Sequence, residues 1–319
     1  MKTLKHILFL SALAIFSLAM PVHSSTIPKG KIILASVFPI YQIVRNITEG
    51  STNAEVTLML PSGLGCPHNY VITPGDTNKI RHAQIIVING LGLDDFILDT
   101  VKKIRNNVTV IDSSEGIDNL IASGSDRRHN HNEHHVSSHD APDDTIYNPH
   151  LFTSPVMSGR IALNIATALA AEIPSDASLF IGNGEKYKEK MDALAEKISD
   201  AGRRTLNKRI VAQHDIFDYM ARDMGLTVTG LIQTHSGLDP SPSQVISLIK
   251  EITEKNAGAI FIEPQYSAKL GQTIAKETHI PIIEIDPAAS GPENAGLDFF
   301  ETTMNRNIKI IMETLGEKQ

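Results

Sequence analysis

The sequence predicts an α/β protein built from two (β/α)4-type lobes with mainly parallel sheets, joined by one long lobe-spanning α-helix. Two observations predict this fold class. Short apolar runs alternate with amphipathic stretches in each half of the chain, and a proline-free stretch rich in Lys, Glu, Ala and Leu separates the halves. Regular alternation of strand and helix is typical of parallel sheets that carry helices on both faces.

Each half contains four apolar runs with the length of short buried strands. We expect strands at residues 31–38, 54–59, 84–89, 108–112, 209–212, 226–231, 259–262 and 281–285. The helices expected around them are 41–48, 73–82, 94–104, 216–224, 242–255, 268–278 and 297–315. Thr73 followed by Pro74 is typical of a helix N-cap and first turn.

The stretch between the halves, residues 177–206, predicts one long helix. About 25 residues at 1.5 Å each give about 37 Å, enough to run along both lobes. An ordinary surface helix is the alternative. The expected organisation is an N-terminal lobe at 26–175, a linking helix at 176–206 and a C-terminal lobe at 207–319.

The N-terminus has the three-part layout of a secretory signal peptide. Lys2 and Lys5 precede an apolar run at residues 7–20, and compact residues follow it. About 14 apolar residues are too few for a bilayer span, which needs about 20; a permanent membrane anchor is the alternative. We expect residues 1–25 to be cleaved and the mature protein to lie in the periplasm. No cysteine near the boundary offers a lipid anchor.

The composition excludes several classes of partner. The chain carries a net charge of −7, and loss of Lys2 and Lys5 with the signal peptide leaves 27 basic side chains against 36 acidic ones. An acidic surface disfavours nucleic acid and anionic lipid. Trp is absent and aromatic residues make up 5%, which disfavours a stacking pocket for sugars or nucleobases. The single cysteine, Cys66, forms no internal disulfide.

A long connection at residues 113–149 interrupts the strand–helix alternation, and its centre, 124–144, is polar and rich in histidine. Loops of this length are usually functional or disordered. Five of its residues form a dense imidazole cluster: His129, His131, His134, His135 and His139. Such a cluster binds zinc, copper or nickel weakly and in several arrangements. We expect accessory metal capture here, with a solubilising linker as the alternative.

Four further residues follow predicted strands, two in each half: His68, His150, His214 and Asp286. Ligands of open parallel sheets bind at the carboxyl ends of the strands. Two lobes that face each other would bring the four side chains together in the interlobe cleft. Three imidazoles and a carboxylate can complete a tetrahedral zinc site. Spacing alone leaves open that each histidine is a hydrogen-bonded loop residue.

The local sequences around the three histidines resemble a known family. PSGLGCPHNYVITPGD, NPHLFTSP and QHDIFDYMARDMGL are similar to the histidine motifs of the cluster A-I metal-binding proteins. These proteins are the zinc and manganese solute-binding components of ABC transporters. The resemblance extends over about residues 30–315 and includes the long central helix and the ETHIPIIEIDPAAS segment.

The resemblance implies that His68, His150 and His214 are metal ligands and that Asp286 is the fourth. It implies a monomeric binding protein, not an enzyme, that delivers Zn²⁺ to the membrane permease of an ABC-type importer. Manganese-type members carry a carboxylate at the position of His214. Three imidazoles favour zinc over the oxygen-preferring Mn²⁺. Alternatives are another transition metal, a zinc-dependent hydrolase, and a surface adhesin or metal buffer.

Two positions depart from the family pattern. Cys66 stands where other members have Asp or another residue; we expect it to shape the turn, with a thiolate ligand as the alternative. The motif after His150 lacks the usual acidic residue, so a backbone carbonyl or Ser154 is expected to orient that imidazole.

Glu263 is the main alternative to Asp286 as the fourth ligand, or it is a hydrogen-bond partner of a ligating histidine. The remaining histidines of the two lobes are expected to be structural: His82, His235 and His279.

Overall fold

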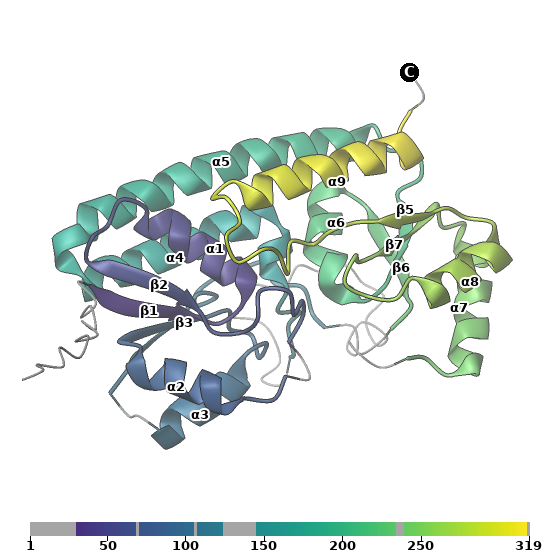
Figure 1. Ribbon diagram of the computed structural model, residues 1–319. Helices are drawn as coiled ribbons and strands as arrows, with labels where there is room; N and C mark the ends of the chain where they lie inside the picture. The colour runs from purple at the N-terminus through teal and green to yellow at the C-terminus, as the bar shows by residue number, and fades with distance from the viewer. Residues whose placement is uncertain (1–29, 68–69, 105–106, 124–144, 234–238, 318–319) are drawn as a thin grey trace, which may run out of the picture.

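The computed structural model describes residues 30–67, 70–104, 107–123, 145–233 and 239–317, which form two lobes (Figure 1). Each lobe is built on a four-stranded sheet whose strands are all parallel. The expected signal peptide, the histidine-rich stretch 124–144 and His68 lie outside the described residues. Within the described residues, no helix has the length and hydropathy of a membrane span.

The sheet of the N-terminal lobe has the strand order β2-β1-β3-β4. Its strands are β1 (Lys31–Ala35), β2 (Ala54–Leu58), β3 (Ile85–Ile88) and β4 (Thr109–Asp112). Its helices are α1 (Phe38–Thr48), α2 (Pro74–His82), α3 (Asp95–Ile104) and α4 (Pro155–Glu172). Figure 1 shows α1 and α4 on one side of the sheet and α2 and α3 on the other.

The sheet of the C-terminal lobe repeats this arrangement with the order β6-β5-β7-β8. Its strands are β5 (Arg209–Ala212), β6 (Thr227–Leu231), β7 (Ala259–Ile262) and β8 (Ile282–Glu284). Its helices are α6 (Asp218–Met224), α7 (Pro242–Lys255), α8 (Lys269–Thr278) and α9 (Phe299–Leu315). Single 3-10 turns lie at η2 (Leu151–Thr153), η3 (Pro174–Asp176) and η4 (Asp215–Phe217).

The strand order creates a switch point in each sheet. The chain adds its second strand on one side of the first and its third strand on the other, so β1 borders β3 and β5 borders β7. Loops that leave two such neighbours diverge to opposite sides of the sheet and open a crevice between them. The positions of the two crevices decide where a ligand can bind.

The long helix α5 (Ala177–Arg203) has 27 residues and is therefore about 40 Å long. It contacts α1 and α4 of the N-terminal lobe and α6 and α9 of the C-terminal lobe. Its buried side chains, among them Phe180 and Met191, belong to one apolar core that also contains Ile86 and Phe261. The lobe-spanning helix is confirmed, and a continuous core joins the lobes along it.

The segment after β8 returns to the N-terminal lobe and makes a second link between the lobes. Phe299 packs edge-on against Phe38, with ring centroids 5.3 Å apart. The Arg45 guanidinium donates to the carbonyl of Ala295 at 2.7 Å, and Asn46 donates to the carbonyl of Leu297 at 3.0 Å. Large hinge motions would break both this link and the α5 core.

Helix α4 was not among the helices predicted from the sequence. Ser154 is its N-cap, with a side chain that accepts from the Met157 backbone N–H, and Pro155 begins it. Strand β1 is shorter than predicted and ends at Ala35. The prediction extended the strand to residue 38, but α1 begins at Phe38 with Pro39 in its first turn, a position that suits proline.

Candidate metal centre

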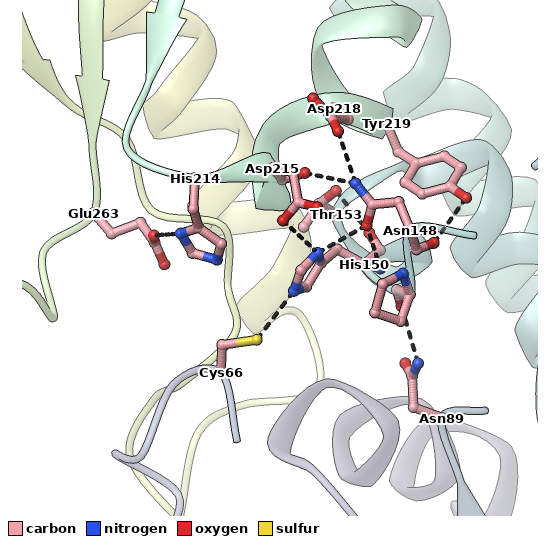
Figure 2. Close-up of polar contacts among 11 residues, drawn as sticks. Cys66, Asn89, Asn148, His150, Thr153, His214, Asp215, Asp218, Tyr219 and Glu263 are labelled. Carbon is pink, nitrogen blue, oxygen red and sulfur yellow. Dashed lines mark hydrogen bonds and ion pairs between the residues drawn. The ribbon is translucent and has the colours of Figure 1, made fainter. Parts of the chain in front are cut away.

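His214 and Glu263 come from the switch point of the C-terminal sheet. His214 follows β5 and Glu263 follows β7 directly, and these strands are neighbours. Gln213 holds both loops, because its backbone N–H donates to the Phe261 carbonyl at 2.9 Å and its side chain accepts from the Glu263 N–H at 3.1 Å. The result is a contact of 2.7 Å between His214 Nδ1 and Glu263 Oε1 (Figure 2).

This pair is almost completely removed from solvent, with side-chain exposures of 1% for His214 and 0% for Glu263. Burial lowers the pKa of His214, but the Glu263 carboxylate, with Asp215 and Asp218, more than offsets this and raises the pKa above its ordinary value. The other ring nitrogen, Nε2, is buried and has no hydrogen-bond partner among the described residues. A buried nitrogen without a hydrogen-bond partner destabilises the folded protein unless it binds a ligand.

His150 is oriented by Asn148, two residues earlier in the chain. The Asn148 side-chain NH₂ donates to the Asp215 carbonyl at 2.7 Å and to Asp218 Oδ2 at 2.8 Å. Its oxygen must therefore accept, and it lies 2.8 Å from His150 Nδ1. Asp215 Oδ1 lies 3.6 Å from the same nitrogen. Nδ1 thus carries the proton, and Nε2 presents a lone pair.

Both lobes fix the backbone of residues 148–150. Asn89, which follows β3, donates to the Pro149 carbonyl at 2.9 Å. Tyr219 of α6 donates through its hydroxyl to the Asn148 carbonyl at 2.9 Å. His150 and Asn148 are both fully buried. These contacts and the hydrogen bond from Nδ1 to Asn148 therefore fix the position of the imidazole.

The two histidines converge between the lobes. Their ring centroids lie 5.5 Å apart with an interplanar angle of 78°. Cys66 joins them from the loop after β2, with its Sγ 3.0 Å from His150 Nε2. One ligand atom from each of Cys66, His150 and His214 lies within 4.8 Å of the others. Figure 2 shows Cys66 below the two rings, on the side toward which His214 turns its second nitrogen.

The other predicted site residues lie outside the described residues or do not belong to the cluster of Cys66, His150 and His214. His68 and the five loop histidines lie outside the described residues, as does His235. Asp286 follows β8 as predicted, but its Oδ2 pairs with Arg306 at 3.0 Å and its Oδ1 accepts from the Ala288 N–H at 2.9 Å. It does not join the cluster of Cys66, His150 and His214 in the described part of the chain.

One expectation about a supporting residue needs correction. Ser154 was expected to orient His150, but its hydroxyl donates to Asp223 and caps α4, and Asn148 orients the ring instead. Asn148 was not predicted as a site residue, although an Asn two residues before a candidate ligand was a signal in the sequence. The alternative that Glu263 contacts a ligating histidine agrees with the geometry.

Two further histidines are accounted for by local structure. His82 is exposed on α2, where Nδ1 lies 2.8 Å from the Asn78 carbonyl. His279 ends α8 in the left-handed conformation, with φ of 58°. Neither residue belongs to the cluster between the lobes.

The fold and the site together define a two-lobed α/β protein in which buried imidazoles from both lobes converge between the lobes. The chain belongs to the family described as zinc-uptake complex component A, periplasmic, whose model matches residues 33–314. This confirms the resemblance and the fold class inferred from the sequence.

Individual relatives agree with this assignment. The zinc-binding protein AdcA of Streptococcus pyogenes serotype M3 is 26% identical over 298 residues, which cover 90% of this chain and 56% of AdcA. The chain thus spans little more than half the length of that relative. The high-affinity zinc uptake system protein ZnuA of Bacillus subtilis is 23% identical over 288 residues, covering 89% of this chain and 87% of ZnuA.

Among solved structures, the solute-binding protein FpvC of Pseudomonas aeruginosa in complex with Mn²⁺ superimposes with a TM-score of 0.75. It is 25% identical, and the match covers 90% of this chain and 98% of FpvC. The likeness therefore extends over both lobes and the helix that joins them.

Proposed function

We propose that this protein captures Zn²⁺ in the cleft between its lobes and delivers it to the membrane permease of an ABC-type importer. One observation carries the proposal. His150 and His214 come from different lobes, both are buried, and each has one ring nitrogen on an acceptor while the other faces a shared space. Zinc sites are built in this way, with hydrogen-bond acceptors next to the ligands that fix the tautomer of each ligating imidazole.

The proposed ligand set contains His68, His150, His214 and one further donor, for which the sequence indicates Asp286. For Asp286 to bind the cation, its carboxylate must leave Arg306, whose side chain is 60% exposed. The five histidines of the 124–144 stretch would collect zinc and raise its local concentration near the cleft.

We propose zinc as the cargo in preference to manganese because His150 and His214 offer imidazole nitrogens as ligands. Mn²⁺ favours oxygen ligands, whereas imidazole suits zinc and copper. A hydrolytic role is disfavoured because it needs a carboxylate available as general base. Glu263 contacts His214, and Asp286 pairs with Arg306.

We further propose that residues 1–25 are a cleaved signal peptide, that the mature protein is a periplasmic monomer, and that it does not act as an enzyme. The continuous core along α5 supports delivery by local loop rearrangement and a small tilt of the lobes. A wide hinge opening would expose that core to water.

Competition titration of zinc with the wild-type protein and two histidine variants tests the proposal. His150→Ala should weaken zinc binding by several orders of magnitude, because it removes a ligand. His82→Ala is the matched control, since His82 is exposed on α2 and away from the cleft. Unchanged zinc affinity in His150→Ala would remove the proposed site.

A further inference from the structure

The Cys66 side chain contacts His150 between the lobes. It lies in the loop after β2, and the Ser62 carbonyl of this loop accepts from the backbone N–H of Gly291 at 3.0 Å. Gly65, with φ of +73°, turns the chain immediately before it. The loop is thus held against the segment that returns from the C-terminal lobe, and the thiol is placed beside the two imidazoles.

The thiol contacts the ring nitrogen that is prepared for a metal. Asn148 holds the His150 proton on Nδ1, and Cys66 Sγ lies 3.0 Å from the opposite nitrogen, Nε2. Two ligand atoms on one tetrahedral zinc ion lie about 3.5 Å apart, given Zn–S and Zn–N bonds of about 2.3 and 2.0 Å. A cation could therefore insert between Sγ and Nε2 with movements well below the length of a bond.

A second and independent observation points to a cation at the same place. His214 is 1% exposed, and its Nε2 has no hydrogen-bond partner among the described residues. Its ligand atom lies within 4.8 Å of those of Cys66 and His150. The three donor atoms are therefore close enough to bind one cation together.

We propose that Cys66 Sγ is a direct ligand of the transported cation, beside His150 and His214, and that it binds in place of Asp286. This inference rests on the proposed function and specifies the chemistry of its site. A thiolate is a soft donor that favours zinc, cadmium and copper(I) and disfavours manganese. Cys66 is thus a specificity-determining residue, which gives this chain a stronger preference for thiophilic metals than a site of imidazoles and carboxylate.

Optical spectroscopy of the metal-loaded protein tests the proposal. Cd²⁺ or Co²⁺ bound to sulfur produces a sulfur-to-metal charge-transfer band that imidazole and carboxylate ligands lack. The chain has one cysteine, so any such band reports Cys66 alone. We expect the band in the wild-type protein and its loss in Cys66→Ser. A wild-type protein without the band would overturn the proposal.

Competition titrations of Zn²⁺ and Mn²⁺ provide the second readout. A serine can still hydrogen-bond His150 but is a poor zinc ligand, so it separates an orienting role from a ligating one. Loss of a group that only orients a ligand usually lowers metal affinity about 10- to 100-fold. Because Cys66 is proposed as a ligand, we expect Cys66→Ser to lower zinc affinity at least about tenfold. Manganese affinity should change less. Retained zinc affinity in Cys66→Ser would contradict the proposal.

Two companion variants keep the outcomes distinct. Asp286→Asn should change zinc affinity less than Cys66→Ser does, and the reverse order would return the fourth position to Asp286. If His150→Ala loses zinc but Cys66→Ser does not, only the role of Cys66 fails. If His150→Ala also retains zinc, the proposed function fails. Unchanged melting temperatures of the metal-free variants confirm that each one folds.

Discussion

Asn148 accepts a hydrogen bond from His150 Nδ1 at 2.8 Å while its own NH₂ donates to the C-terminal lobe. The donor contacts leave only one orientation for the amide, and that orientation fixes the tautomer of the histidine. The Asn148 amide thereby determines which nitrogen of His150 carries the proton and which presents a lone pair. The contact also crosses between lobes, because Asp218 belongs to α6.

Removal of this amide should weaken zinc binding without loss of the ligand. We expect Asn148→Ala to reduce zinc affinity about 10- to 100-fold, the usual effect when a group that orients a ligating histidine is lost. Competition titration against a chelator measures the change. Wild-type affinity in the variant would show that His150 needs no orientation from Asn148.

The buried carboxyl of Asp94 makes the stability of the protein depend on pH, and it holds the loop that supports the site. It accepts from the backbone N–H groups of Asn89 at 2.6 Å and Gly90 at 3.1 Å, and Asn89 in turn holds the Pro149 carbonyl. Burial raises the pKa of Asp94 from 3.8 to about 6, although Ser36 and the two backbone N–H groups act against this. The folded state therefore binds this proton more tightly than the unfolded chain does.

The contribution of Asp94 to stability should be present below pH 3.8 and be lost as the pH rises toward 6. A shift of about two units corresponds to about 3 kcal/mol of unfolding free energy. Asn resembles the protonated acid. The unfolding free energy of Asp94→Asn, taken relative to that of the wild type, should therefore be higher at pH 7 than at pH 4.5. Urea unfolding of both proteins at both pH values gives the difference. An equal difference at the two pH values would contradict the raised pKa.

Two glycines of α5 form a matched pair for testing the packing of the linking helix. A Cβ at Gly184 would lie 2.7 Å from Ala166 Cβ of α4, whereas a Cβ at Gly182 would meet nothing within 4 Å. We expect Gly184→Ala to destabilise the protein by about 1–3 kcal/mol through overpacking. Gly182→Ala should stabilise it by up to about 1 kcal/mol, because alanine favours helix. Thermal unfolding tests both signs, and equal effects would refute the close approach of α4 and α5.

Deletion of residues 126–140 separates the two proposed classes of zinc site. The truncated protein should bind fewer zinc ions while it keeps the tight one, because the tight ligands lie on the lobes. Metal analysis after dialysis measures the number, and competition titration measures the affinity. Disappearance of tight binding together with the stretch would reverse the proposed division of roles.

The sequence predicted most of the fold because its signals were local. Each of the eight strands lies within about three residues of its expected bounds. Short apolar runs between helical segments are typical of buried strands. Helix α4 was missed because the analysis assigned helices only around strands and within the linking stretch. Its signal, Ser154-Pro155 followed by an apolar run, was present.

The site was harder to predict because its geometry depends on contacts between distant segments. Position after a strand, together with the resemblance of the local sequences, selected His150 and His214, whose rings lie 5.5 Å apart. It could not reveal that Arg306, twenty residues downstream on α9, pairs with Asp286. Nor could it place the Cys66 thiol against His150, which depends on how the β2 loop meets the other lobe.

The central claim is that one cation binds between His150 and His214. Anomalous diffraction at the zinc absorption edge from crystals of the zinc-loaded protein tests it most directly. We predict a single strong peak about 2.0–2.1 Å from Nε2 of each of the two imidazoles. A zinc-loaded crystal with no peak between these rings, or with zinc bound only elsewhere, would contradict the account.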